Sequence, residues 1–319
     1  MREASFLSQN EEKFRQVEQI LDKDSNLTPD ESADLFVELT DDLSYARTHY
    51  PRSVSTKYLN SLTRGIFQKL TQARREKFDR VWVFWKYEVP LVVFRHRMKL
   101  LYAFLFFTLS MAIGIVSTHY DEAFPRAVLG DEYVEMTLKN IEKGDPMGVY
   151  KESDSGGLFF GITLNNVRVA SYTFIAGLLF SFGTYYFLFV NGVMVGAFQY
   201  FFVTKGLFWQ SALAIWIHGT IEISSIVIAG AAGITLGNSL LFPGTFPRKQ
   251  SLMKGAKDAL KISIGLIPLF IFAGFLESYV TRLTDLSNVI RGGIILASAS
   301  FIIWYFVIYP RKLAKEYTS

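Results

Sequence analysis

Two ionisable residues, His218 and Glu222, lie inside a long apolar stretch from Ile217 to Gly233, which reads IHGTIEISSIVIAGAAG. Residues four apart share one face of an α-helix, so both side chains point the same way. An ionised group is costly in hydrocarbon, so this face must point to the protein interior or to a wet cavity. Metal ligation, proton relay and catalysis would each use such a pair, and so would a structural clasp of hydrogen bonds between helices.

The histidines limit the metal chemistry that the sequence predicts. A zinc hydrolase usually has three protein ligands and a water, whereas the chain has only four histidines. The other three are expected away from the membrane centre: His49 and His96 on the cytoplasmic side, and His119 at an outer boundary. Gly219 follows His218, so no HExxH motif is present. The sequence therefore offers His218 and Glu222 at most as metal ligands.

Two further polar residues interrupt apolar stretches, Asn191 in FVNGVMVG and Glu277 in AGFLESYVT. Counting from Phe208 at 1.5 Å per residue places His218 roughly 15 Å and Glu222 roughly 21 Å below the outer surface. We expect Glu277 near the outer end of its span and Asn191 near the inner end of its own. His218 is then closer to the level of Glu277, and Glu222 is closer to Asn191. A separate polar group at the outer end of a span comprises Asn165, Asn166 and Arg168.

The elements that carry these residues are apolar spans. The chain is 50% hydrophobic and 16% aromatic, and a full crossing needs about 20 residues. The sequence predicts six spans: Leu100–Ser117, Val169–Val190, Val193–Thr204, Phe208–Gly233, Ile262–Tyr279 and Val289–Tyr309. The third is short and follows the second through Asn191-Gly192, where we expect a tight turn or a broken helix. These spans predict an all-α, polytopic membrane helix bundle in a lipid bilayer.

Basic residues near the span ends predict the orientation. They are Arg95, Arg97 and Lys99 before the first span, Arg248, Lys249, Lys254 and Lys257 between the fourth and fifth, and Arg311, Lys312 and Lys315 after the sixth. All three groups fall on one side only if the third span is a crossing. Both termini are therefore predicted to be cytoplasmic, in a multi-pass protein of the cytoplasmic membrane.

Residues 1–92 predict a soluble helical domain. Three amphipathic helices are expected, the first starting at a capping box of Ser8 and Glu11 and the second at Thr28. The aromatic and basic segment Phe78–Lys99 is typical of a membrane interface, with a fourth helix of the bundle as the alternative. Residues 93–319 form the membrane domain, with an acidic outer loop at 118–166 and a helix near Asp131–Glu142.

Small residues in the spans predict close helix packing. The glycines concerned are Gly177, Gly192, Gly196, Gly219, Gly230 and Gly233. Such faces also permit a homodimer. The sequence has no phosphate-binding loop, nucleophile elbow or dinucleotide fingerprint, so it identifies no cofactor, and no nucleic-acid partner is expected. It has no cysteine either, which excludes disulfides and thiolate metal sites.

Three segments in this order resemble the stage II sporulation protein M family: Asn165–Phe198, IHGTIEISSIVIAGAAG and Phe272–Thr281. The segment Leu35–Phe67 is similar to longer members of the family, which carry a cytoplasmic N-terminal helical domain. By this resemblance, hallmark positions of the family are occupied by His218, Gly219, Glu222, Asn191, Gly192 and Glu277. The resemblance implies a polytopic inner-membrane protein. In endospore formers the family member is a scaffold that recruits cell-wall hydrolases to the engulfing septum.

Three functions remain open on the sequence. The first is a non-enzymatic scaffold or assembly partner for envelope-associated proteins, which would use the N-terminal domain and the outer loop to bind protein partners. The second is a transporter or channel component lined by the His/Glu face. The third is an intramembrane metal-dependent hydrolase. The sequence favours the scaffold.

Overall fold

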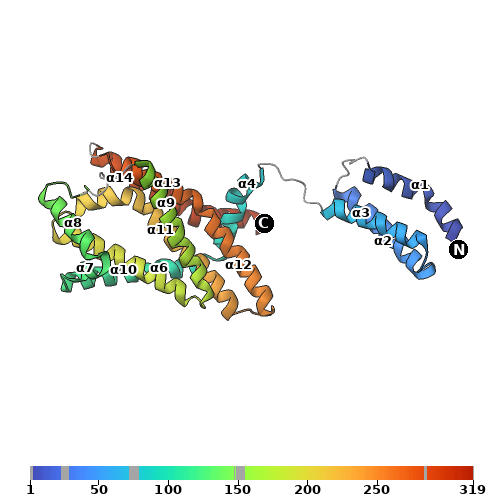
Figure 1. Cartoon of the computed structure of the whole chain (residues 1–319), viewed down its shortest axis with the longest axis horizontal. Helices are drawn as coiled ribbons and strands as arrows, with labels where there is room; N and C mark the ends of the chain where they lie inside the picture. Colours follow the sequence, from blue (N-terminus) through green and yellow to red (C-terminus); the bar gives the residue numbers. More distant parts are fainter. Residues whose placement is uncertain are drawn as a thin grey trace. The chain divides into compact units, whose positions relative to one another are not determined.

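The computed structural model describes residues 3–22, 29–71, 79–146, 148, 155–283 and 286–318. Within these residues every regular element is helical, which confirms the predicted all-α class (Figure 1). The chain divides into two compact units, Met1–Arg80 and Val81–Ser319. Each has a hydrophobic core of its own.

The N-terminal unit consists of α1 (Glu3–Asp22), α2 (Pro29–His49) and α3 (Val54–Thr71). Its core contains apolar residues spaced three or four apart along each helix, as expected of amphipathic helices: Phe14, Val17, Leu39, Leu43, Leu59, Leu62 and Ile66. The capping box at Ser8 is wrong, because α1 runs through Ser8 from Glu3. Phe6 extends the buried stripe by two turns, and its burial explains the earlier start. Thr28 lies outside the described residues.

The second unit contains five helical segments that are long and apolar enough to cross a membrane. They are α6 (Arg97–Tyr120), α10 (Phe182–Thr204), α11 (Phe208–Leu241), Arg248–Val280 and Asn288–Glu316. The fourth comprises α12 (Arg248–Gly265), α13 (Ile267–Phe275) and the π-helix η4 (Leu276–Val280). The fifth comprises α14 (Asn288–Ile303), the π-helix η5 (Trp304–Ile308) and most of α15 (Tyr309–Thr318).

A sixth long helix, α9 (Ser155–Ile175), packs against α11 and α13. It is about as long as a span, at 1.5 Å per residue, but Asn165, Asn166 and Arg168 lie near its middle. α9 is not among the five segments that are long and apolar enough to cross a membrane, so the position of these three residues at the outer end of a span stays a prediction. The first part of the predicted second span, from Val169, belongs to this helix, which begins at Ser155.

The break between the second and third predicted spans is misplaced. Residues 176–181 make the turn, through the 3₁₀ segment η3 (Ala176–Leu178) and two residues with positive φ, Phe180 and Ser181. A Cβ at Gly177 would lie 2.1 Å from the carbonyl oxygen of Gly233, so this turn packs backbone against backbone on α11. α10 then runs without a break through Asn191, which a prediction from local sequence alone places at the turn.

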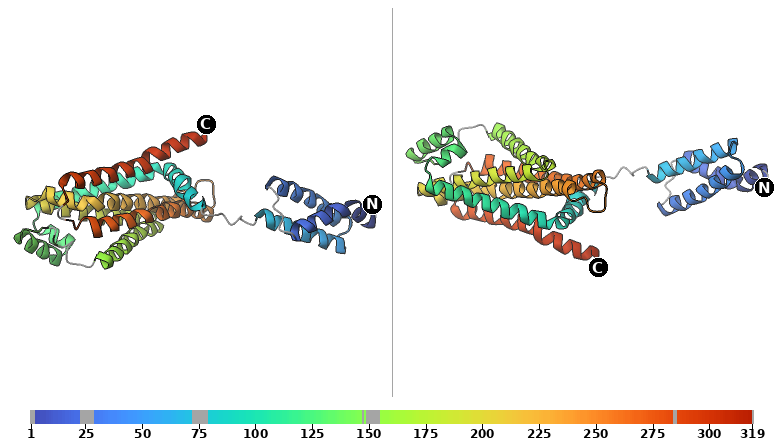
Figure 2. Two further views of the ribbon diagram at one scale, coloured as in Figure 1. Left: turned by 90° about the horizontal axis from the view of Figure 1, so that it is seen from above. Right: turned by 90° about the horizontal axis from the view of Figure 1, so that it is seen from below.

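Helices α6 and α10 lie side by side (Figure 2). Cβ atoms at Gly192 and Gly196 would lie 2.7 Å from Ser110 Cβ and 2.1 Å from the carbonyl oxygen of Met111. Added side chains at these two positions would push the helices apart. The loop at 118–166, which is predicted to lie outside, contains α7 (Phe124–Leu129) and α8 (Asp131–Glu142), and α8 confirms the predicted helix. Residues 147 and 149–154 of that loop lie outside the described residues.

The segment that follows the N-terminal unit comprises α4 (Asp79–Val83), the π-helix η1 (Phe84–Glu88) and α5 (Val89–Arg95). Val89, Val92 and Val93 are buried in the main core of the second unit. The Trp85 indole also donates to the carbonyl oxygen of Gly265, at 3.2 Å. The alternative of a fourth helix in the N-terminal bundle is therefore wrong. Its place at a membrane interface stays a prediction.

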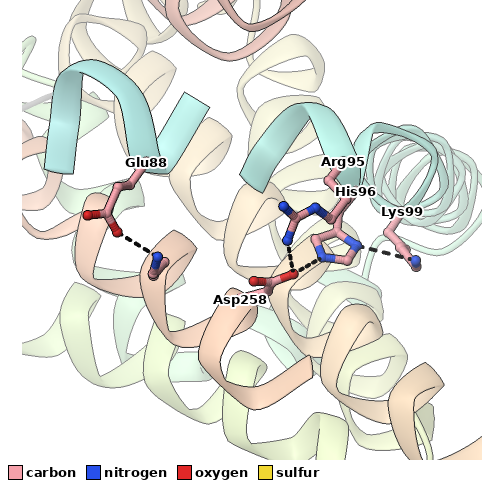
Figure 3. Close-up of polar contacts among 6 residues, drawn as sticks. Glu88, Arg95, His96, Lys99 and Asp258 are labelled. Carbon is pink, nitrogen blue, oxygen red and sulfur yellow. Dashed lines mark hydrogen bonds and ion pairs between the residues drawn. The ribbon is translucent and has the colours of Figure 1, made fainter. Parts of the chain in front are cut away.

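A charged cluster ties this segment to α12 (Figure 3). Asp258 Oδ2 accepts hydrogen bonds from Arg95 Nη1 and His96 Nε2, each at 3.0 Å. The Lys99 ammonium can only donate, so it donates to His96 Nδ1 at 3.3 Å and leaves the ring hydrogen on Nε2. Glu88 pairs with Lys261 one turn further along α12, at 2.5 Å. These contacts join both ends of α5 to α12.

Candidate functional site

Two elements position the ionisable residues of the second unit. α11 carries His218 and Glu222 on one face, and η4 carries Glu277. The π-helical bond from the Thr281 amide to the carbonyl oxygen of Leu276, at 2.8 Å, inserts an extra residue into this turn. A π-turn of this kind rotates the side chains that follow relative to a regular helix, and here it lies where Glu277 and Thr281 meet α11.

The three side chains form one cluster. His218 Nε2 lies 3.8 Å from Glu277 Oε2. One ligand atom from each of His218, Glu222 and Glu277 lies within 4.8 Å of the other two. His218 is buried, whereas both carboxylates keep partial exposure. Depth counted along the predicted spans separates Glu222 from Glu277, whereas the structure brings them together.

The His218 ring is held by Thr281. Its Nδ1 lies 3.1 Å from Thr281 Oγ1, and that hydroxyl lies 3.2 Å from the carbonyl oxygen of Leu276. A hydroxyl has one hydrogen, which it donates to the carbonyl, so it accepts the ring N–H at Nδ1. In the neutral ring Nε2 then carries the lone pair, and this is the atom that faces Glu277.

A cavity of about 890 Å³ opens beside the cluster. His218, Glu222 and Glu277 line it together with Asn165, Asn166 and Gln199, and α7, α9, α10 and α11 supply most of its apolar wall. The cavity is not enclosed, and the exposed Gly157 and Gly161 at the start of α9 belong to its lining. The partial exposure of both carboxylates is exposure to this space.

Asn166 is the polar neighbour of Glu222. Its amide lies close enough to interact with the carboxylate but makes no hydrogen bond of ordinary geometry, so Asn166 Nδ2 has no hydrogen-bond partner among the described residues. Asn166 is only 5% exposed. Burying an amide donor without a partner costs about 1–3 kcal/mol. A bound group that accepts from Asn166, or that reorients Glu222, would remove this cost.

Gln199 of α10 is a second polar lining residue, and sequence reasoning missed it. Its amide donates to Ser211 Oγ at 3.0 Å and accepts from Trp216 Nε1 at 3.2 Å, which links α10 to α11. The available signal was an amide inside a predicted apolar span, the same signal that singled out Asn191. Thr281 is the last residue of the Phe272–Thr281 motif, and nothing in the sequence indicates its contact with His218, which depends on the π-turn.

Two of the residues singled out in the sequence lie apart from the cluster. Asn191 does not line the cavity, and its amide donates to the carbonyl oxygen of Phe187 within α10, at 2.8 Å. The depth estimate that put Glu222 closer to Asn191 than to Glu277 assumed the misplaced break, and in the structure Glu222 lies with Glu277. Arg168 is exposed and also lies outside the lining.

The glycines divide into two kinds. Close backbone or side-chain approaches surround Gly177, Gly192, Gly196, Gly230 and Gly233. Gly219 differs, because a Cβ there would meet only Ile215 Cγ2, at 3.7 Å. Gly219 lies between His218 and Glu222 in the sequence and lines the cavity. No close contact requires a glycine there for helix packing.

The cluster combines an imidazole nitrogen with two carboxylates beside an accessible space. That combination can bind a metal ion, share a proton or hold a cationic solute. It also ties α11 to η4 through the His218–Thr281 contact, as a structural clasp would. A clasp alone gives no reason for the adjoining cavity.

Comparison with known proteins agrees with the motif order. The sequence pattern described as stage II sporulation protein M matches residues 103–282, which include the whole cluster, and a domain of unknown function, DUF8413, matches residues 4–72. An uncharacterized protein of Methanocaldococcus jannaschii is 24% identical over 190 residues, which are 59% of this chain and 83% of that protein. No solved structure matches this chain. The match over residues 103–282 covers more than half of the chain, which therefore belongs to the stage II sporulation protein M family.

Proposed function

We propose that the second unit is a membrane-embedded binding or transport protein, and that its ligand enters the cavity and is held by His218, Glu222 and Glu277. The observation that carries this proposal is the gathering of all three groups at one wall of an open cavity of about 890 Å³. That volume is in the range of small-molecule sites. Ionisable groups at membrane depth ordinarily belong to solute or proton pathways.

The orientation proposed for this function places the cavity mouth outside. Counting α9 as a crossing gives six, and the basic residues before α6, at the start of α12 and in α15 then all lie on the cytoplasmic side. The natural absence of cysteine makes this testable with single introduced thiols. An impermeant thiol reagent should label Glu132→Cys on α8 from outside intact cells and Lys249→Cys only after lysis. The opposite pattern would reverse the orientation.

Water access to the cluster tests the proposed function. Gly219→Cys places a thiol in the cavity lining without a clash, and Gly293→Cys on α14 places one where a Cβ meets nothing within 4 Å. A small, impermeant methanethiosulfonate should modify Gly219→Cys from the outer face and should not modify Gly293→Cys, which faces lipid in this arrangement. An unreactive thiol at position 219 in a folded protein would refute an accessible site.

A scaffold role is the second candidate, and the separate N-terminal unit supports it. That unit has its own core and is matched by a domain pattern of its own. A variant that lacks residues 1–80 tests this role. The deletion should end at residue 80, because Val89, Val92 and Val93 belong to the core of the second unit. Native membranes containing the full chain should give a reproducible co-purifying protein that the deletion loses. Recovery of the same proteins with both forms would count against this role.

A further inference from the structure

The donor atoms of the cluster match the ligand set of a divalent transition-metal ion. One imidazole nitrogen and two carboxylate oxygens lie within 4.8 Å of one another. Ligands bound at about 2.0–2.2 Å around a tetrahedral ion are about 3.4 Å apart. Closing the cluster to that spacing needs movements of about an ångström in the Glu222 and Glu277 side chains. Both already border open space.

The charges of the cluster also favour a cation. No lysine or arginine lines the cavity in the described part of the chain. Glu222 and Glu277 therefore lie close together with no cationic lysine or arginine beside them, and His218 is the third member of the cluster. Two carboxylates at this range repel each other strongly when both are ionised and water is scarce. A divalent cation would offset both carboxylates at once, whereas a monovalent solute would leave one of them unpaired.

The residues around the cluster are those that accompany a metal ligand. Metal-binding histidines usually donate the other ring N–H to an oxygen acceptor, which orients the ring. Thr281 Oγ1 supplies that acceptor and directs the Nε2 lone pair of His218 toward Glu277. Beside Glu222, Asn166 is a buried cavity-lining residue whose Nδ2 makes no hydrogen bond of ordinary geometry among the described residues. It is placed to orient a Glu222 carboxylate that has moved onto an ion.

We propose that His218 Nε2, one oxygen of Glu222 and one oxygen of Glu277 bind a divalent first-row transition ion of the Zn²⁺ type. Nitrogen and oxygen donors suit this class, and the three protein ligands leave a fourth position open to the cavity. The inference rests on the proposed function, since it names the ligand class of the same site. It extends the ligand set available from sequence, which stopped at His218 and Glu222.

Zinc binding to the untagged, full-length protein in detergent tests the inference. After chelation and dialysis, titration with Zn²⁺ followed by elemental analysis should give about one ion per chain. Glu277→Gln and His218→Gln should each weaken binding at least about tenfold. Glu132→Gln, an exposed carboxylate on α8, is the matched control and should bind as the wild type does. Mg²⁺ in large excess should not displace the zinc.

Several outcomes would overturn the inference. These are no stoichiometric zinc, zinc binding that persists unchanged in a folded Glu277→Gln protein, and ready displacement by Mg²⁺. Gel filtration of each variant separates loss of ligands from loss of fold. The proposed function fails by a different observation, an unreactive thiol at position 219. An accessible cavity without zinc would therefore reject the metal and leave the binding function standing.

Discussion

The packing of α6 against α10 gives a quantitative prediction for Gly196→Ala. The added Cβ would lie 2.1 Å from the carbonyl oxygen of Met111 and 2.9 Å from its carbonyl carbon. Ordinary contact begins at 3.4 Å, so the backbones must separate locally by about 1.3 Å. The atoms in conflict are main chain on α6, and no side-chain rotation can remove the overlap.

The expected loss follows from two opposing effects. Overpacking of a tight interface costs about 1–3 kcal/mol, and a backbone clash belongs at the upper end. Alanine in place of a helical glycine regains up to about 1 kcal/mol. We therefore expect Gly196→Ala to lower the free energy of unfolding by about 2 kcal/mol. For a unit of this size, that is a fall of about 4–8 °C in the unfolding midpoint.

Gly293→Ala is the matched control, because it changes a helical glycine of α14 whose Cβ would meet nothing within 4 Å. It should leave the midpoint unchanged or raise it by about 2–4 °C, for a gain of up to about 1 kcal/mol. The assay is thermal unfolding of the two full-length variants in one detergent, followed by tryptophan fluorescence. If Gly196→Ala melts at or above the control, close backbone approach does not stabilise the α6–α10 contact.

Two further predictions concern carboxylates outside the cavity. Asp258→Asn removes the anionic acceptor of Arg95, so we expect faster tryptic cleavage after Arg95. The free energy of unfolding should fall by about 1 kcal/mol, a small loss because the Arg95 side chain is 60% exposed. Cleavage at the same rate as in the Glu132→Gln control would contradict this prediction. In the isolated N-terminal unit, hydrogen bonds from two serine hydroxyls near the start of α3 lower the pKa of Glu3 below 4.5. The stabilising contribution of Glu3 is therefore present above about pH 4.5 and is lost as the pH falls through the lowered pKa. The unfolding midpoint of the wild type should exceed that of Glu3→Gln at pH 5, and this difference should shrink between pH 5 and pH 3. A difference that stays constant over this range would contradict the role given to Glu3.

Helical periodicity was sufficient for the features that depend on one helix. The buried stripes of α1, α2 and α3, the helix over Asp131–Glu142 and the shared face of His218 and Glu222 all follow from residues three or four apart. Each is local, because one helix fixes which side chains face the same way. The start of α1 was missed because Phe6 adds two buried turns that outweigh a favourable cap at Ser8.

Features that depend on contact between helices were not available from the sequence. Asn191-Gly192 has the composition of a turn, yet Gly192 is needed for contact with Ser110 and lies inside α10. The true turn at 176–181 is set by the contact of Gly177 with Gly233, residues far apart in the chain. Because the turn lies at 176–181 and not at Asn191, Asn191 lies away from the cluster, and the amide next to Glu222 is that of Asn166.

The composition of the cluster argues against a purely structural clasp. Removing an ionisable pair from water costs several kcal/mol, and well-packed apolar residues of similar volume often stabilise a buried site equally or better. A clasp between α11 and η4 could be built from Thr281 and a neutral amide without two carboxylates within 4.8 Å of an imidazole. It would also have no need of a cavity of about 890 Å³ beside it, since voids weaken packing.

The double variant Glu222→Met, Glu277→Met separates these views. If the cluster only joins helices, this variant should be at least as stable as the wild type and should keep its cellular function. If the cluster binds an ion or solute, stability should hold and function should be lost.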